Sequence, residues 1–211
     1  MYCTIFLGML LFTACSDGTT YVVIETEYGD MKAELYNSTP IHKENFIKLV
    51  KESFYDSLLF HRVIPGFMIQ GGDPKSKTAP AGSSLGSGGP GYTLDAEIGA
   101  PHFRGTLAAA RTGDAVNPER KSSGSQFYVV QGSKQDDAML DSWQARKGFI
   151  YNDTQREKYI TLGGAPQLDG DYTVFGEVIE GLEVIDKIAA VDRDNRDRPL
   201  QNVIMKIRLA R

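Results

Sequence analysis

The chain has 211 residues, 41% of them hydrophobic and 24% charged, which is the usual balance of a globular domain large enough to bury a core. Its formal net charge of −4 and the lack of a Lys- or Arg-rich run argue against nucleic acid as a partner, because phosphate binding requires clustered cations. The three histidines (His42, His61 and His102) show no ligand spacing with Cys, Asp or Glu. No metal site is therefore expected, and no cofactor is implied.

The first residues form a segment that differs from the rest of the chain. An apolar run at residues 5–12 is too short to span a bilayer comfortably and ends in small residues before Cys15. It resembles the bacterial lipoprotein signal, which implies removal of residues 1–14, a lipid anchor on Cys15, and a place in the bacterial cell envelope facing the periplasm or the exterior. The apolar run lacks the preceding Lys or Arg of that signal. An ordinary cleaved signal and an uncleaved anchor are the alternatives.

A β-hairpin and a helix are predicted after a polar tether at residues 15–20. Residues 21–27 are rich in β-branched side chains, a turn signal follows at residues 28–30, and apolar residues then alternate at positions 31, 33 and 35. Thr39 is the expected N-cap of a helix over residues 41–53, with Pro40 at its first position. This helix is expected to plug one end of a sheet.

Two strands are predicted on either side of the bend Pro65-Gly66, because apolar residues alternate at positions 59, 61 and 63 and again at 67 and 69. Such a strand pair brings together Arg62, Phe67, Met68 and Gln70. One cation, an aromatic ring, a thioether and an amide form a shallow apolar site with a few polar groups, as expected of a peptide or small-ligand pocket. The stretch contains no nucleophile.

The middle of the chain alternates between loops and short strands. The pattern predicts a Gly-, Ser- and Pro-rich loop over residues 73–92, a short central strand over 105–111, a polar loop over 112–121 and another strand over 125–131.

The pattern of residues 132–166 predicts an inserted pair of helices. Met139, Leu140 and Trp143 share one helical face, and Asn152 or Asp153 is positioned to cap a second helix that carries Tyr159 and Ile160. The insertion either packs on the exterior of the fold or forms a wall that contacts substrate or a partner.

The remainder returns to β structure, with a strand at residues 172–179, a short helix at 182–190 and a last strand with apolar residues at positions 203, 205, 207 and 209. Many short antiparallel strands with two capping helices fit a closed barrel, which has no exposed edges. The fold class is therefore mainly β. No repeat or second domain is visible, so residues 21–211 are interpreted as one domain.

Three motifs connect the chain to a known family. Residues 60–73 contain Phe-His-Arg, Pro-Gly-Phe-Met and Gln-Gly-Gly-Asp, residues 123–130 read Ser-Gly-Ser-Gln-Phe-Tyr-Val-Val, and residues 168–178 contain Leu-Asp-Gly and Val-Phe-Gly. In this order they closely resemble the cyclophilins, the peptidyl-prolyl cis-trans isomerases. The resemblance implies a closed eight-stranded antiparallel β-barrel capped by two helices, here with residues 132–166 as a helical insertion. It also implies rotation about Xaa-Pro peptide bonds, with proline-containing peptides and folding proteins of the envelope as partners and a monomer as the expected state.

The chemistry of this rotation indicates which residue matters most. The C–N bond has partial double-bond character, so rotation crosses a barrier of about 18–20 kcal/mol. In the twisted state the proline nitrogen becomes basic, and a donor aimed at it binds the transition state more strongly than the planar ground state. Arg62 is the expected donor, because its guanidinium is always charged and presents several donors in one plane.

The resemblance also assigns the other site residues by position. Gln70, Phe67 and His61 join Arg62 as the catalytic set, although His61 lies in an apolar strand pattern and is interpreted as a structural histidine more readily than as an acid or base. The matching substrate-binding positions are Met68, Ala110, Arg111, Thr112, Gln126, Tyr128, Gln167, Leu168 and Tyr172.

Several positions depart from the family pattern. Gln167 replaces a tryptophan that lines the pocket and contacts cyclosporin, Tyr172 replaces a histidine, and Tyr128 replaces a phenylalanine, which adds a hydroxyl that needs a partner. These departures predict an altered substrate preference. The alternative function is a proline-segment-binding chaperone or scaffold with little turnover; a hydrolase has little support, because no Ser or Cys sits in a nucleophile context.

Overall fold

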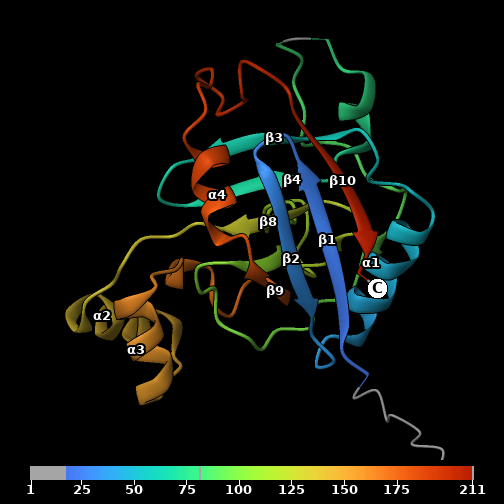
Figure 1. Ribbon diagram of the computed structural model, residues 1–211. Helices are drawn as coiled ribbons and strands as arrows, with labels where there is room; N and C mark the ends of the chain where they lie inside the picture. Colours follow the sequence, from blue (N-terminus) through green and yellow to red (C-terminus); the bar gives the residue numbers. More distant parts are fainter. Residues whose placement is uncertain (1–17, 81, 211) are drawn as a thin grey trace, which may run out of the picture.

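Eight strands close into a barrel in which all neighbours are antiparallel (Figure 1). The computed structural model describes residues 18–80 and 82–210. Around the barrel the order is β1, β10, β3, β4, β8, β6, β9 and β2. The strands are β1 (Thr20–Thr26), β2 (Gly29–Leu35), β3 (Leu58–Ile64), β4 (Met68–Gly71), β6 (Thr106–Ala109), β8 (Phe127–Val130), β9 (Val174–Glu180) and β10 (Val203–Leu209). The mainly β, eight-stranded closed barrel expected from the sequence is confirmed.

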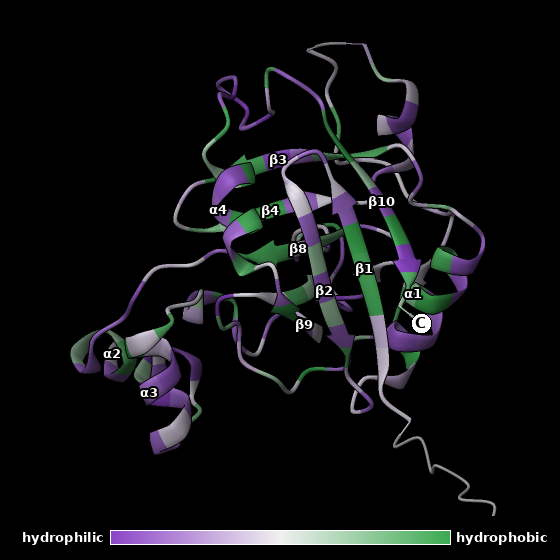
Figure 2. Ribbon diagram, viewed as in Figure 1, coloured by the Kyte–Doolittle hydropathy of each residue, from purple (hydrophilic) through white to green (hydrophobic). Residues whose placement is uncertain are grey.

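Two helices cover opposite ends of the barrel. Helix α1 (Pro40–Lys51) follows the end of β2, and α4 (Leu182–Ala189) packs at the start of that strand, where a Cβ on Gly29 would lie 3.0 Å from Val184. Their apolar faces join the inward side chains of the strands in one buried core. Figure 2 shows the apolar positions concentrated on the barrel strands and on the inner faces of these helices.

Helix α1 begins at Pro40 with Thr39 at its N-cap position, as predicted, but a different residue satisfies the first N–H groups of the helix. The Thr39 side chain makes no capping hydrogen bond. Instead, the carboxylate of Glu97 accepts from the backbone N–H groups of Ile41 at 3.1 Å and His42 at 3.0 Å. A carboxylate at this end satisfies unpaired N–H groups and interacts favourably with the helix dipole.

Strand β3 departs from a regular alternation. Its pairing with β4 passes from Phe60–Gly71 to Arg62–Gln70, so His61 is an extra residue in the ladder. Because of this bulge, Phe60 and Val63 both point into the core, whereas a regular strand would place them on opposite faces.

Glycine is required where β4 ends. Gly72 has a φ of +87°, and a Cβ there would lie 2.2 Å from the carbonyl oxygen of Ser125. The Ser125 hydroxyl donates to the Gly72 carbonyl at 2.8 Å, which ties the end of β4 to the segment before β8. The close approach of these two backbones explains the second glycine of the Gly-Gly pair in the first motif.

The predicted helical insertion stands beside the barrel (Figure 1). It consists of α2 (Asp137–Lys147) and α3 (Asp153–Thr161), and Asn152 caps α3 through a reciprocal capping box with Gln155. Leu140, Tyr151 and Tyr159 form a small core with Phe103. Met139 and Ile160 are 51% and 36% exposed, so only part of the expected apolar face is buried.

The connections contain short elements. The expected loop over residues 73–92 includes the 3₁₀ helix η1 (Pro74–Thr78), and a second one, η2 (Pro166–Leu168), follows the insertion. Strands β5 (Thr93–Leu94) and β7 (Ser122–Ser123) pair outside the barrel. Within residues 18–80 and 82–210 no helix has the length and apolar character needed to cross a bilayer. The expected signal at residues 1–14 and the lipidation site Cys15 lie outside the described residues.

Candidate active site

A hollow of about 280 Å³ opens on the outer surface of the β3–β4–β8 part of the barrel. The register sets Arg62 opposite Gln70, and Gln70 opposite Tyr128, so three neighbouring strands each present one residue to the same place. We call this the proline hollow. It is lined by Arg62, Phe67, Met68, Gln70, Ala110, Arg111, Tyr128, Leu168 and Tyr172.

The walls of the proline hollow combine apolar side chains with polar groups. Met68 and Tyr128 are buried, and Phe67, Leu168 and Tyr172 pack against them while remaining partly exposed. The guanidinium of Arg111 lies over the Tyr172 ring, 4.6 Å from its centroid, and donates to Asp114 at 2.5 Å. Arg111 is therefore a fixed wall of the hollow, with its charge already paired.

A chain of amides leads to Arg62. The amide nitrogen of Gln126 donates to the carbonyl oxygens of Gly86 at 2.9 Å and Gly88 at 2.6 Å. Because those oxygens only accept, Oε1 of Gln126 must face Gln70, whose amide nitrogen donates to it at 3.1 Å. Oε1 of Gln70 is then left to accept from Nη1 of Arg62 at 3.4 Å. Gln126 thus acts on the arginine through Gln70.

Arg62 is held loosely. Its side chain is 43% exposed, and Nε lies 3.8 Å from the carboxylate of Asp197, which is 35% exposed. An ion pair this exposed contributes little stability. Among the described residues only these two contacts engage the guanidinium, so further N–H donors are available to a group in the proline hollow.

Four predicted residues lie outside this hollow: Gln126, which stands behind Gln70 in the chain of amides, and the three described next. Thr112 lines an adjoining hollow of about 470 Å³, which shares Gln70, Ala110 and Arg111 with the first. Gln167 is half-buried in η2 and lines neither of them. Burial lowers the pKa of His61 to about 4, and neither of its ring nitrogens has a hydrogen-bond partner among the described residues. His61 is thus a buried neutral group beside the site.

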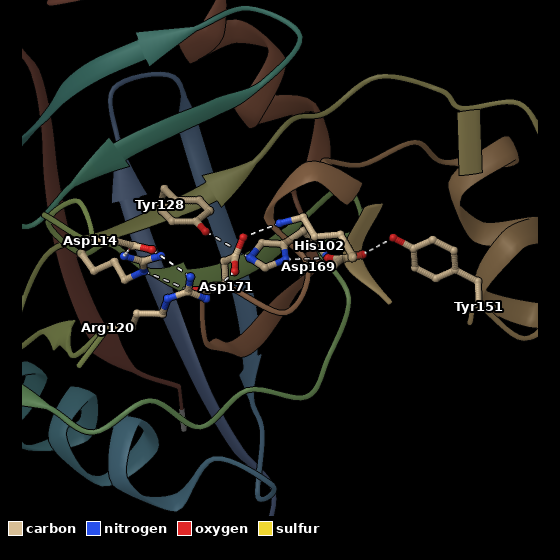
Figure 3. A network of polar contacts seen from close by, with 9 residues as sticks. His102, Asp114, Arg120, Tyr128, Tyr151, Asp169 and Asp171 are labelled. Carbon is tan, nitrogen blue, oxygen red and sulfur yellow. Dashed lines mark hydrogen bonds and ion pairs between the residues drawn. The ribbon is translucent and has the colours of Figure 1, made fainter. Parts of the chain in front are cut away.

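The sequence reasoning missed the group that supports the Tyr128 wall (Figure 3). The Tyr128 hydroxyl lies 3.1 Å from Nε2 of His102, whose Nδ1 lies 2.7 Å from the carboxylate of Asp169. Burial raises the pKa of the Tyr128 hydroxyl well above its usual range, so this group keeps its proton. The sequence did contain a signal for this group. Tyr128 adds a hydroxyl at a position where the family has phenylalanine, and a buried hydroxyl needs a hydrogen-bond partner.

The same carboxylate connects the site to the insertion. Oδ2 of Asp169 accepts from the hydroxyls of Tyr151 at 2.7 Å and Tyr159 at 2.5 Å. No residue of 132–166 lines the proline hollow. The insertion therefore reaches the site through the buried network behind it.

Comparison with known proteins decides the family. The model of the family described as cyclophilin type peptidyl-prolyl cis-trans isomerase/CLD matches residues 21–208. The chain belongs to the cyclophilin family of peptidyl-prolyl cis-trans isomerases. The activity expected from the motifs, isomerisation of Xaa-Pro bonds, is thereby confirmed as that of its family.

Two bacterial relatives of this cyclophilin are similar along most of its length. A Staphylococcus aureus protein that is named as a peptidyl-prolyl cis-trans isomerase is 36% identical over 190 residues, which cover 90% of each chain. A Streptococcus pyogenes protein named as a bifunctional phosphatase and isomerase is 35% identical over 194 residues. That match covers 88% of this chain but 37% of the longer protein.

Solved structures give the same result. A Cryptosporidium parvum cyclophilin type peptidyl-prolyl cis-trans isomerase aligns with a TM-score of 0.65 and 26% identity, covering 92% of this chain and 98% of that one. A second crystal structure of that protein, in the presence of the dipeptide Ala-Pro, aligns with a TM-score of 0.64 over 90% of this chain.

Proposed function

We propose that this cyclophilin isomerises Xaa-Pro bonds in the proline hollow, with Arg62 as the donor to the proline nitrogen. The observation that carries this assignment is the position of Arg62 in one hollow with Phe67, Met68 and Leu168. The guanidinium is contacted by the Gln126–Gln70 chain and has further N–H donors available. A proline ring enters among Phe67, Met68 and Leu168, and the reacting nitrogen then lies within reach of the guanidinium.

The chemistry follows from differential binding. In the planar ground state the nitrogen lone pair is delocalised and accepts poorly; in the twisted state it becomes a good acceptor, so the Arg62 hydrogen bond strengthens as the bond rotates. A charge-assisted hydrogen bond contributes about 1.5–3 kcal/mol, or about one to two factors of ten in rate. The apolar walls contribute the rest by fixing the ring while the preceding carbonyl turns.

The part of the substrate that precedes the proline is proposed to lie along Ala110, Arg111 and Thr112, where the two adjoining hollows meet. Backbone groups there bind the residue before proline, and Gln70 binds substrate backbone. Proline-containing segments of folding proteins are therefore the proposed substrates, and the chain is proposed to act as a monomer.

The place of action is proposed from the first residues. The apolar run at residues 5–12 ahead of Cys15 supports export and a lipid anchor, which would hold the isomerase at a membrane of the bacterial cell envelope. Uncatalysed prolyl isomerisation takes tens to hundreds of seconds, so an isomerase in this place would speed the folding of envelope proteins.

The test is the isomerisation rate of Xaa-Pro peptides with the purified chain and its Arg62→Ala variant. We expect acceleration by the wild type and a loss of about tenfold or more in kcat/KM for Arg62→Ala. Arg208→Ala is the matched control, because Arg208 lines neither hollow and pairs with Glu25 between β10 and β1. Peptide binding without acceleration by the wild-type chain would replace this assignment with the binding-module alternative.

A further inference from the structure

A separate hollow of about 310 Å³ lies on the other side of Arg62 and Gln70. Its charged and titratable lining is entirely basic in the described part of the chain, and its remaining lining comes from residues 83–86 and Gln70. We call it the arginine hollow. The basic residues are His61, Arg62, Arg111, Arg196 and Arg198.

Arg198 is the least compensated of these cations. It is 6% exposed, and its guanidinium donates to the Ser83 carbonyl and, at 3.4 Å, to the side-chain oxygen of Asn202. No carboxylate of the described residues lies within ion-pair distance of that guanidinium. A buried charge held only by neutral acceptors is costly, and an anion in the hollow would reduce that cost.

His61 supplies a second buried polar group without a partner. It is 4% exposed and lies beneath Gly86 on the wall of the hollow, where a Cβ on Gly86 would lie 3.5 Å from Nε2. Neither ring nitrogen has a partner among the described residues. A neutral imidazole carries one N–H, which an anion in the hollow would accept.

The neighbouring carboxylates do not line the hollow, although two of them form long ion pairs with its exposed arginines, Arg62 and Arg196. Asp197 lies between Arg62 and Arg193, at 3.8 and 3.6 Å. Asp194 lies 3.7 Å from Arg196 and accepts the backbone N–H groups of Arg196 and Arg198. Asp73, whose charge interacts with His61, accepts the backbone N–H groups of residues 75, 86 and 88.

We propose that the arginine hollow binds an anionic side chain of the substrate, a carboxylate or a phosphate ester, close to the proline being isomerised. Arg196 and Arg198 are its specificity-determining residues, and His61 is the donor behind them. This preference rests on the proposed function, because the arginine hollow shares Arg62 and Gln70 with the proline hollow and only a chain bound there would reach both.

The experiment is a peptide series on the purified chain. Matched Xaa-Pro peptides carry Gln, Glu, phosphoserine or Lys at each position within about three residues of the proline, and kcat/KM is measured for each. At one or more positions we expect Glu or phosphoserine to be favoured about tenfold over Gln, mainly through KM and less so at high salt, with Lys disfavoured. The Glu and phosphoserine arms distinguish the two sources of the anion.

The variants locate the preference. In Arg196→Gln, whose side chain is 56% exposed in the wild type, and in Arg198→Gln, the ratio of Glu to Gln peptides is expected to fall toward one. In Arg208→Gln, which lies away from the hollow, the ratio stays as in the wild type. The ratio of kcat/KM for Glu and Gln peptides is measured within each protein. Arg196→Gln and the wild type therefore test the proposal even if the buried Arg198→Gln variant does not fold.

The outcomes separate the two proposals. Isomerisation of Gln peptides with no preference for an anion at any position overturns the arginine hollow and leaves the proposed function intact. A preference that persists in Arg196→Gln and Arg198→Gln also overturns it. Failure of the wild type to accelerate any peptide overturns the proposed function, and the preference with it.

Discussion

The hydroxyl of Tyr128 lies 3.1 Å from Nε2 of His102, which places a buried polar pair directly behind the proline hollow. A carboxylate only accepts, so Nδ1 of His102 donates to Asp169, which leaves Nε2 facing the Tyr128 hydroxyl. Asp169 also accepts the backbone N–H of His102 and the hydroxyls of Tyr151 and Tyr159. All four acceptor positions of one buried carboxylate are thus occupied.

Removing the Tyr128 hydroxyl should affect stability more than catalysis. In Tyr128→Phe the ring remains as a wall of the hollow, but Nε2 of His102 is left buried without a partner. We expect the free energy of unfolding to fall by about 1–3 kcal/mol, with kcat/KM within about twofold of the wild type. Urea denaturation and peptide isomerisation measure the two quantities. Tyr172→Phe is the control for stability, because the Tyr172 hydroxyl makes no hydrogen bond to the described residues; an equal loss there would contradict the assignment.

Asp169→Asn should lower the free energy of unfolding more than Tyr128→Phe does. The amide that replaces the carboxylate turns N–H groups toward partners that are themselves donors. We expect a loss of about 3 kcal/mol in the free energy of unfolding, and faster proteolysis of residues 132–166, whose core depends on Tyr151 and Tyr159. The control is Asp141→Asn on α2, an exposed partner of Arg156 that should contribute less than about 1 kcal/mol. Unchanged stability and protease resistance in Asp169→Asn would show that the carboxylate does not hold the insertion.

The barrel could be predicted because its strands carry local signals. In β10 the buried and exposed positions alternate almost throughout, and β1 and β2 are joined by a turn signal of their own. The Arg62, Phe67, Met68 and Gln70 set could be predicted from a short stretch, since a hairpin places neighbouring residues together. The bulge at His61 could not, because it depends on the fit between β3 and β4.

The parts that escaped prediction pair residues far apart in the chain. Glu97 caps α1 by accepting from Ile41, 56 residues before it, and Asp169 meets His102 across 67 residues. No local pattern carries such a pairing. Gln167 was assigned to the site by its position in the motif, but in η2 its side chain stands beside Leu168, which alone of the two lines the proline hollow.

The burial of His61 predicts a pH dependence of stability. Its pKa is lowered to about 4 by burial, whereas in the unfolded chain it lies near 6.5, so the unfolded state binds the proton first as the pH falls. The native state is therefore destabilised progressively between pH 6.5 and about 4, by up to about 3 kcal/mol, and no further below that range. Above pH 6.5 the imidazole is neutral in both states and this contribution to stability is fully present.

The measurement is the free energy of unfolding of the wild type and of His61→Gln across this pH range. Other groups titrate there too, so the informative quantity is the difference between the two proteins. We expect the wild type to lose stability relative to His61→Gln as the pH falls from 6.5 to 4. A difference that stays constant with pH would mean that His61 is protonated as easily in the fold as outside it.

The anchor makes a separate prediction about Cys15. With Cys15 diacylated, the chain is expected in the membrane fraction and labelled by palmitate, because two acyl chains hold a protein at a bilayer far more firmly than one. Cys15→Ser should abolish the label and release the chain or leave it unprocessed. Cys3→Ser is the matched control: Cys3 lies in the segment expected to be removed, so this variant should behave as the wild type. An unlabelled wild-type chain that is secreted would indicate an ordinary cleaved signal, and an unlabelled chain that stays membrane-bound in both variants would indicate an uncleaved anchor.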